Sequence, residues 1–320
     1  MKRFCYILIS LLMPFTASAT HIFGDVNNDE TVNVTDVVSL VNHILGNGTL
    51  DNATYGDING GGEVNVSDIV ALTNYILGQY EHTLPDIEVT ANGVTFTMKG
   101  VASGTFMMGA DSSTDPNAFS NEAPIHQVTV GDYYIAETEV TQELWKAVMG
   151  SNPSSFTEND SLPVETVTWD DCQTFVATLS SLTGRSFRLP TEAEWEFAAR
   201  GGNKSNGFYY SGSNSIQEVC WFGNNSGSTT HKVAEKLPNE LGLYDMSGNV
   251  YEWCSDWYAR YTADEAVNPT GPETGERRVR RGGSFDGWNI YCRSTRRLYA
   301  FPTHKDDYLG LRLAMDIEQQ

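Results

Sequence analysis

The chain has 320 residues, 40% of them hydrophobic and 11% aromatic, and its 20 basic and 41 acidic side chains give a formal net charge of −21. This length suggests two domains or one large one, and the apolar content supports a packed core, which excludes a disordered protein. So acidic a surface argues against nucleic acid as a partner and is compatible with calcium binding outside the cell.

Residues 1–19 have the three parts of a secretory signal. Two basic residues are followed by a mainly apolar run, 4–13, which is too short to span a bilayer, and then by a small-residue cleavage site that ends at Ala19. Cleavage near Ala19 is expected to release an exported chain, to the periplasm, the cell surface or the medium. No later segment predicts a membrane span.

An internal repeat follows. GDVNNDETVNVTDVVSLVNHILG (24–46) recurs as GDINGGGEVNVSDIVALTNYILG (56–78). Oxygen-bearing residues have the spacing of an EF-hand loop, so the first copy predicts the calcium ligands Asp25, Asn27, Asp29, Thr31 (through its carbonyl), Asn33 and Asp36. The second copy predicts Asp57, Asn59, Glu63, Asn65 and Asp68. Gly61 replaces an expected Asp there, which predicts a weaker site.

Each loop is expected to lead into a helix. In the first copy, the apolar residues expected on its inner side are Val37, Val38, Leu40, Val41, Ile44 and Leu45. Two such loop–helix pairs resemble a type I dockerin, a small all-α module. The resemblance implies a cohesin-like partner on another protein, contacted at Val34-Thr35 and Val66-Ser67. The module is expected over residues 20–80, followed by a linker over 81–88.

The remaining chain, 89–316, reads as one domain of short strands and capped helices. Alternation predicts strands at 94–98, 104–108, 126–130 and 133–135. Thr141 and Thr191 are expected to cap helices, and Glu194 completes a capping box with Thr191. A further helix is expected over 169–182. After residue 201 the chain is rich in Gly, Asn and Ser and predicts loops.

Three motifs of this domain occur together: RLPTEAEWEFAARGG (188–202), NELGLYDMSGNVYEWCSDWY (239–258) and RVRRGGSF (278–285). In this order they resemble the formylglycine-generating enzyme, or sulfatase-modifying factor, family, from about residue 94 to 313. The resemblance implies an α+β class, with a C-type-lectin-like fold of sparse secondary structure that is held by aromatic side chains and bound Ca²⁺.

The carboxylate of Glu252 lies between large rings in the second motif. From spacing alone, a packed turn in which Glu252 pairs with an arginine is favoured over a calcium site. The resemblance reverses this preference, because one calcium site of the family matches the side chains of Asp245 and Glu252 and the carbonyls of Gly248 and Val250.

Four cysteines, Cys172, Cys220, Cys254 and Cys292, follow the signal segment, and an even number in an exported chain suggests disulfides with three alternative pairings. The family resemblance favours Cys254–Cys292 and Cys172–Cys220. Family members that make formylglycine resemble copper oxidases with two cysteines, three and eight residues after the serine of the GGS turn. Here Ser284 and the second cysteine, Cys292, are present, but Gly287 stands at the first position.

These observations favour an exported calcium-binding protein whose main domain is catalytically silent and serves scaffolding or the binding of a peptide or glycan, linked to the use of polysaccharides or sulfated glycans. The alternative is an active formylglycine-generating oxidase, which would need copper, with Cys292 and Ser284 as catalytic residues. The one basic cluster, which would suit an anionic glycan, is expected instead to form ion pairs with the Glu-rich motifs. Its residues are Arg277, Arg278, Arg280, Arg281, Arg293, Arg296 and Arg297.

Overall fold

The computed structural model describes residues 22–50, 53–78 and 82–317. The expected signal segment, with its cleavage site, lies outside these residues. Among the residues described, no helix is both long and apolar enough to cross a membrane.

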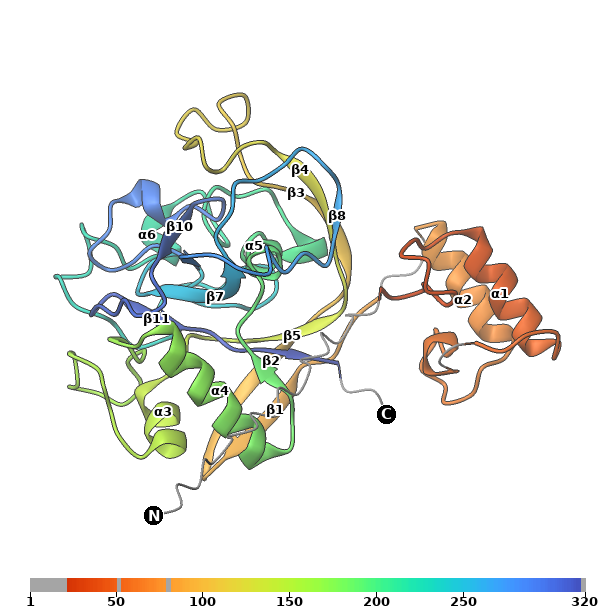
Figure 1. Ribbon diagram of the computed structural model, residues 1–320, viewed down its shortest axis with the longest axis horizontal. Helices are drawn as coiled ribbons and strands as arrows, with labels where there is room; N and C mark the ends of the chain where they lie inside the picture. The colour runs from red at the N-terminus through yellow and green to blue at the C-terminus, as the bar shows by residue number, and fades with distance from the viewer. Residues whose placement is uncertain (1–21, 51–52, 79–81, 318–320) are drawn as a thin grey trace, which may run out of the picture.

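The repeats form a separate helical module beside the main domain (Figure 1). Its helices are α1 (Val34–Ile44) and α2 (Val66–Ile76), with one 3₁₀ turn, η1 (Ala53–Gly56), between them. Both helices begin with a capping box, in which the side chain of Asn33 or Asn65 accepts a backbone N–H and the Asp three residues later accepts the N–H of that Asn. The repeat in the sequence is therefore a repeat of loop and capped helix.

The core of the module is small. Leu40 and Leu72 are fully buried between the helices, and Val37 and Ile44 pack against them. Val38 and Leu45 were expected on the same inner face, but they are 53% and 67% exposed. A single helix partner covers only a narrow stripe of α1, so these two side chains lie outside it.

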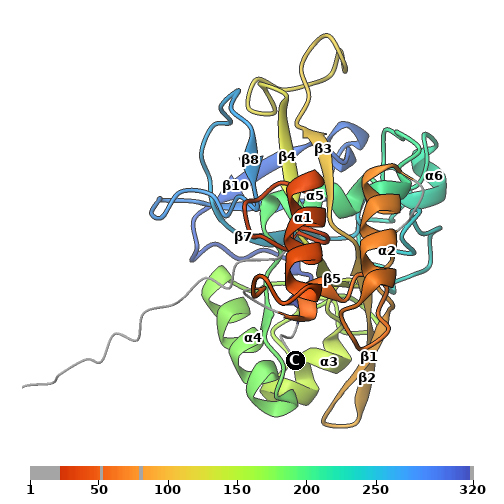
Figure 2. The same ribbon diagram turned by 90° about the vertical axis from the view of Figure 1, so that its right-hand side faces the viewer.

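The module touches the main domain through a few side chains near residue 82. The ring of Phe23 stacks on His82, with centroids 3.5 Å apart, and the His82 Nε2 atom lies 2.9 Å from an Asp132 oxygen. The N–H of Phe23 donates to the Ser103 hydroxyl at 3.3 Å. Figure 2 views α1 and α2 from the side of the module, with the main domain behind them.

The largest sheet of the main domain has five strands in the order β1-β2-β5-β12-β6. They are β1 (Ile87–Ala91), β2 (Val94–Val101), β5 (Tyr133–Ala136), β12 (Ala314–Asp316) and β6 (Phe187–Arg188). The strand β12 lies between β5 and β6. The last strand of the domain therefore belongs to the same sheet as its first two strands. The strand β1 begins at Ile87, within the segment expected to be a linker.

A four-stranded sheet, β10-β9-β7-β11, carries the motifs of the C-terminal half. Its strands are β7 (Tyr251–Trp257), β9 (Arg278–Arg281), β10 (Arg297–Ala300) and β11 (Leu309–Leu311), and a third sheet joins β3 (Gly104–Met108), β4 (His126–Val130) and β8 (Ala266–Val267). The strand β7 pairs in parallel with β11 and antiparallel with β9. It is therefore buried at the centre of the domain.

Helices cover these sheets, and the capped helices are found where the sequence predicts them. They are α3 (Gln142–Met149), α4 (Trp169–Thr183), α5 (Glu192–Ala199) and α6 (Ile216–Val219), with the 3₁₀ turns η2 (Gly202–Lys204) and η3 (Asn289–Cys292). The hydroxyl oxygens of Thr141 and Thr191 accept N–H groups in the first turns of α3 and α5. All eight residues of α5 are buried, so this helix runs through the core.

Candidate functional site

A surface pocket of about 340 Å³ lies where the RVRRGGSF motif meets the segments after it. It is lined by Tyr251, Arg280, Ser284, Asp286, Gly287, Trp288, Tyr291, Arg296, Leu298 and Tyr308. Strands β7, β9 and β10 and the turn η3 each supply part of the wall. A concave site with aromatic walls and a few charged groups is the usual form of a ligand-binding site.

The pocket contains a cation with unused hydrogen-bond donors. Within the described chain, the Nε and Nη1 atoms of Arg280 are buried without a hydrogen-bond partner. The guanidinium lies over the rings of Tyr251 and Tyr308, 4.6 and 5.6 Å from their centroids. Trp288 lines the same pocket and is 76% exposed. This combination suits a ligand that has both an anionic group and a flat apolar face.

The two predicted catalytic residues lie on different sides of the pocket wall. Ser284 and Gly287 line the pocket, and the N–H of Gly287 donates to the Ser284 carbonyl at 2.9 Å. Cys292 is fully buried in a small core cluster that also contains Cys220 and Tyr210. A Cβ atom added at Gly287 would lie 3.2 Å from the Ser284 carbonyl oxygen, so a larger side chain fits after a small adjustment.

The disulfide pairing suggested by the family resemblance is wrong. All four cysteines are buried thiols, and the thiol in contact with Cys292 is that of Cys220, not that of Cys254. Cys254 lies on β7 in the core cluster of Trp195, and Cys172 lies in another cluster around α4. Two motifs can be close in the fold while their cysteine side chains point into different parts of the core.

Glu252 has the arginine partner that its spacing alone predicts. Its carboxylate accepts hydrogen bonds from Arg312, at 2.7 Å from Nη2, and from the indole N–H of Trp195, at 2.6 Å. All three side chains are fully buried. Burial of this carboxylate is therefore compensated by one cation and one neutral donor.

A third carboxylate, Glu139, lies in the same place and was not anticipated from the sequence. It accepts the N–H of Val250 at 3.0 Å and the side-chain amide of Asn249 at 2.7 Å. Burial, with repulsion by Asp245 and Glu252, raises the pKa of Glu139 well above its usual range. Its partners are about 110 positions away in the sequence, so no local pattern could reveal it.

These residues offer oxygen atoms of the kind that a calcium ion takes, but the atoms of the three carboxylates do not all lie within 4.8 Å of one another in the described structure. Glu139, Asp245 and Glu252 bring three carboxylates into the core. Each of them is attracted electrostatically to the same cation, Arg312. Burial raises the pKa of Asp245 to about 6, and Glu252 adds repulsion. Within the described residues, the carbonyl oxygens of Gly248 and Val250 accept no hydrogen bond. Surplus buried negative charge beside unpaired carbonyls is the donor set that Ca²⁺ takes.

The first loop of the module gathers three carboxylates, from Asp25, Asp29 and Asp36, whose oxygen atoms lie within 4.8 Å of one another. It is the one such group of metal-ligating side chains in the described part of the chain. The side-chain oxygens of Asp25 accept the N–H groups of Asp29 and Glu30, which closes the loop.

The second loop is built in the same way but with less charge. The carboxylate of Asp57 accepts the N–H groups of Gly61 and Gly62 at 2.8 and 2.7 Å, and Asp68 accepts that of Asn59 at 3.0 Å. Gly61 contributes no side-chain oxygen, as the sequence indicates. The two loops therefore have the same backbone hydrogen bonds to their first Asp, but the second loop has one carboxylate fewer.

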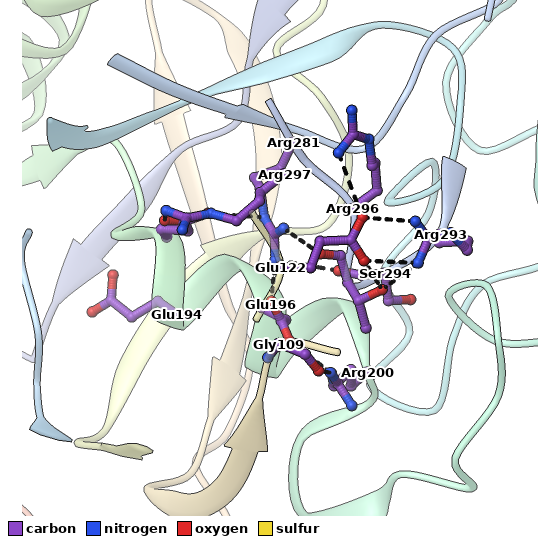
Figure 3. A network of polar contacts seen from close by, with 12 residues as sticks. Gly109, Glu122, Glu194, Glu196, Arg200, Arg281, Arg293, Ser294, Arg296 and Arg297 are labelled. Carbon is purple, nitrogen blue, oxygen red and sulfur yellow. Dashed lines mark hydrogen bonds and ion pairs between the residues drawn. The ribbon is translucent and has the colours of Figure 1, made fainter. Parts of the chain in front are cut away.

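Four of the seven arginines pair with buried glutamates, but only Arg281 and Arg297 pair with the Glu-rich motif as expected, because Glu122 lies outside it. Figure 3 shows Glu122 between Arg293 and Arg296, and Glu196 between Arg281 and Arg200. Arg297 binds Glu192, with Nε 2.8 Å from an oxygen. The other three stack on aromatic rings instead, and these are Arg277, Arg278 and Arg280. Of these, Arg280 is the one in the pocket.

Sparse secondary structure, a buried network of arginine and glutamate, and two loop–helix repeats together define the class: a C-type-lectin-like domain of the formylglycine-generating type with a dockerin-type module. Residues 87–317 match the model of the sulfatase-modifying factor enzyme 1-like domain, and residues 23–79 match that of the dockerin type I domain. The chain belongs to the sulfatase-modifying factor family and carries a dockerin module.

The relatives of this chain carry different names. The structure titled Treponema denticola variable protein 1 is similar over 73% of this chain and 100% of its own, with 36% identity and a TM-score of 0.68. The chaperone protein LppX of Paenibacillus barcinonensis is 35% identical, over 59% of this chain and 77% of the relative. The formylglycine-generating enzyme of Thermomonospora curvata is also 35% identical, over 54% of this chain and 61% of the relative.

Proposed function

We propose that this is an exported calcium-binding protein whose dockerin module docks to a cohesin-like partner, while the main domain binds a ligand without catalysis. The observation that carries the catalytic part is Gly287, which lines the pocket where the oxidases of the family are expected to have a thiol. The negative charge of the chain and its acidic loops support calcium binding and a location outside the cell.

The residues of the pocket do not fit a copper site. Copper(I) prefers paired soft thiolates. Gly287 has no side chain, and the sulfur of Cys292 is fully buried in the cluster of Cys220. Tyr251 also stands in the pocket where the family resemblance implies a tryptophan. Changes at two wall positions support loss of the oxidase chemistry, while the pocket itself is retained.

The ligand that suits the pocket best is an anionic sugar, sulfated or uronic. Arg280 supplies a guanidinium to the pocket wall, and Trp288 offers an exposed ring on which a sugar face can lie. A peptide is the competing ligand. The test is an array of sulfated, uronic and neutral glycans and of peptides, with Arg280→Ala and the exposed control Arg260→Ala. Loss of acidic-glycan binding in Arg280→Ala alone supports the proposal, and binding of peptides alone refutes it.

We propose calcium sites in the dockerin module and in the main domain. In the module, the ligands are the oxygens of both loops, with the first loop binding more tightly. In the main domain, the ligands are Asp245, Glu252 and the carbonyls of Gly248 and Val250, and Glu139 adds charge beside them. When bound there, the ion would supply positive charge that stabilises the fold.

Docking of the module is supported by apolar side chains that are exposed at matching positions of both repeats. They are Val34 and Val66, Val38 and Val70, and Leu45 and Leu77, each more than half exposed. Exposed apolar patches of this kind mark protein-binding surfaces. A panel of cohesin modules tests the proposal, with Val34→Asp and Val66→Asp together expected to abolish capture. Capture that is unchanged in this double variant would refute the surface.

The decisive experiment on chemistry is incubation with a peptide from a sulfatase, Cu⁺ and O₂, with mass detection of the aldehyde. No product is expected from the parent chain. Turnover by the parent would establish the alternative, an active formylglycine-generating oxidase with Cys292 and Ser284 in its site. Turnover in Gly287→Cys alone would mean that the missing thiol is what silences the domain.

A further inference from the structure

Cys220 and Cys292 are brought together from distant parts of the chain. Cys220 directly follows α6, and Cys292 ends η3. Both are fully buried, and their thiols are in hydrogen-bond contact. Tyr210, Val219 and Phe222 surround them in one small core cluster. The pair is therefore sealed behind the wall of the pocket.

Two glycine turns leave room for the two sulfurs. A Cβ atom on Gly248 would lie 2.5 Å from the Sγ of Cys220, and one on Gly283 would lie 2.7 Å from the Sγ of Cys292. Both glycines have a φ in the left-handed region, +89° and +81°. A bond between these sulfurs would link the segment after α6 to the end of η3.

We propose that Cys220 and Cys292 are a modification site that becomes a disulfide when the chain folds outside the cell. The reaction is exchange with a disulfide-bearing oxidant. Two S–H bonds break, one S–S bond forms between the cysteines, and the two electrons and two protons reduce the oxidant to its dithiol. Because both sulfurs are buried in the folded chain, exchange takes place before the core closes.

The other cysteines stay thiols under this proposal. Cys172 lies in α4 among the side chains of one core cluster, and Cys254 lies on β7 in another. Among the described residues, neither of these clusters contains another cysteine. The bond would also occupy the sulfur of Cys292, which removes it as a ligand for copper. The proposal takes only export from the proposed function.

The test is a map of the thiols in the full chain, recovered from outside the cell. The chain is unfolded without reductant, blocked with N-ethylmaleimide, digested and examined by mass spectrometry. Peptides linked through Cys220 and Cys292 are expected, with the maleimide on Cys172 and Cys254. Four blocked cysteines, or a link from Cys292 to Cys254, would overturn the proposal.

A second sample separates the pairing from the export. The reduced full chain is refolded in a glutathione redox buffer and mapped in the same way. A Cys220–Cys292 link in this sample alone supports the pairing and overturns its formation where the chain is exported, whereas no link in either sample overturns the pairing.

Two variants complete the test. Cys220→Ser is expected to expose a third blocked thiol, at Cys292, while the control Cys254→Ser keeps the link. If the parent chain binds Cu⁺ and shows no link, and Cys220→Ser does not bind Cu⁺, the two thiols form a buried metal site. This result would overturn the disulfide. If Cys220→Ser does not fold, the maps of the parent chain still decide.

Discussion

Asp245 gives the sharpest prediction, because its charge should stabilise or destabilise the main domain according to whether calcium is bound. Its side chain is 3% exposed, and burial raises its pKa from 3.8 to about 6. The folded state therefore holds a proton that the unfolded state loses, so stability falls as the pH rises through 6. This difference between the folded and unfolded pKa costs the metal-free fold about 3 kcal/mol above that pH.

Asp245→Asn removes the charge and keeps an oxygen that can accept the N–H of Ala234, now bound at 2.8 Å. Asparagine also tolerates the left-handed φ of 58° at this position. At about pH 7.5 without calcium, the variant is expected to be more stable by up to about 3 kcal/mol, or roughly 6–12 °C in Tm. With calcium at about a hundred times its Kd, the parent should gain about 3 kcal/mol that the variant does not.

The measurement is a melt followed by tryptophan fluorescence, with chelator or calcium, at about pH 5 and pH 7.5. All seven tryptophans lie between residues 145 and 288, so the signal reports the main domain and not the module. Asp256→Asn is the matched control, because burial, with repulsion by Glu192, raises the pKa of Asp256 to about 7 at another place in the core. An equal calcium response in Asp245→Asn and the parent would refute the reasoning.

Three further predictions concern the module and the buried charges. Chelation should unfold residues 24–78, and calorimetry should show that the second loop releases Ca²⁺ first; equal affinities would contradict this. Gly61→Asp should bring the second loop close to the affinity of the first, and an unchanged affinity would mean that the missing carboxylate is not the cause. Arg281→Met should cost about 3 kcal/mol in a denaturant melt, because Glu196 is fully buried and would keep only the partly exposed Arg200 as its cation. The exposed control Arg260→Met should stay within about 0.5 kcal/mol.

Local chemistry made much of the fold predictable. The caps at Thr141 and Thr191, and the loops with their ligand spacing, depend on residues within a few positions of one another, and the structure has each helix where they predict it. The strands at 104–108 and 126–130 alternate clearly because one face of each is buried and the other is more exposed. Local pattern is sufficient where one face of an element meets water.

Pairing over long distances could not be predicted. In the sequence, β7 appears only as an aromatic cluster. Nothing near it in the chain reveals that it pairs with β9 and β11. Glu139 and Cys220 were missed as parts of their sites for the same reason. Their partners, Asn249 and Cys292, lie far along the chain.

The structure separates what holds this domain together from what would do chemistry in it. Glu122, Glu192 and Glu196 pair with arginines in the core, and a buried charge left without its partner costs several kcal/mol. These residues are therefore hard to change one at a time. Gly287 lines the surface pocket, where substitution costs the fold little. A chain under these constraints can lose an oxidase site and keep the fold and a binding pocket, which is the history that the proposed function implies.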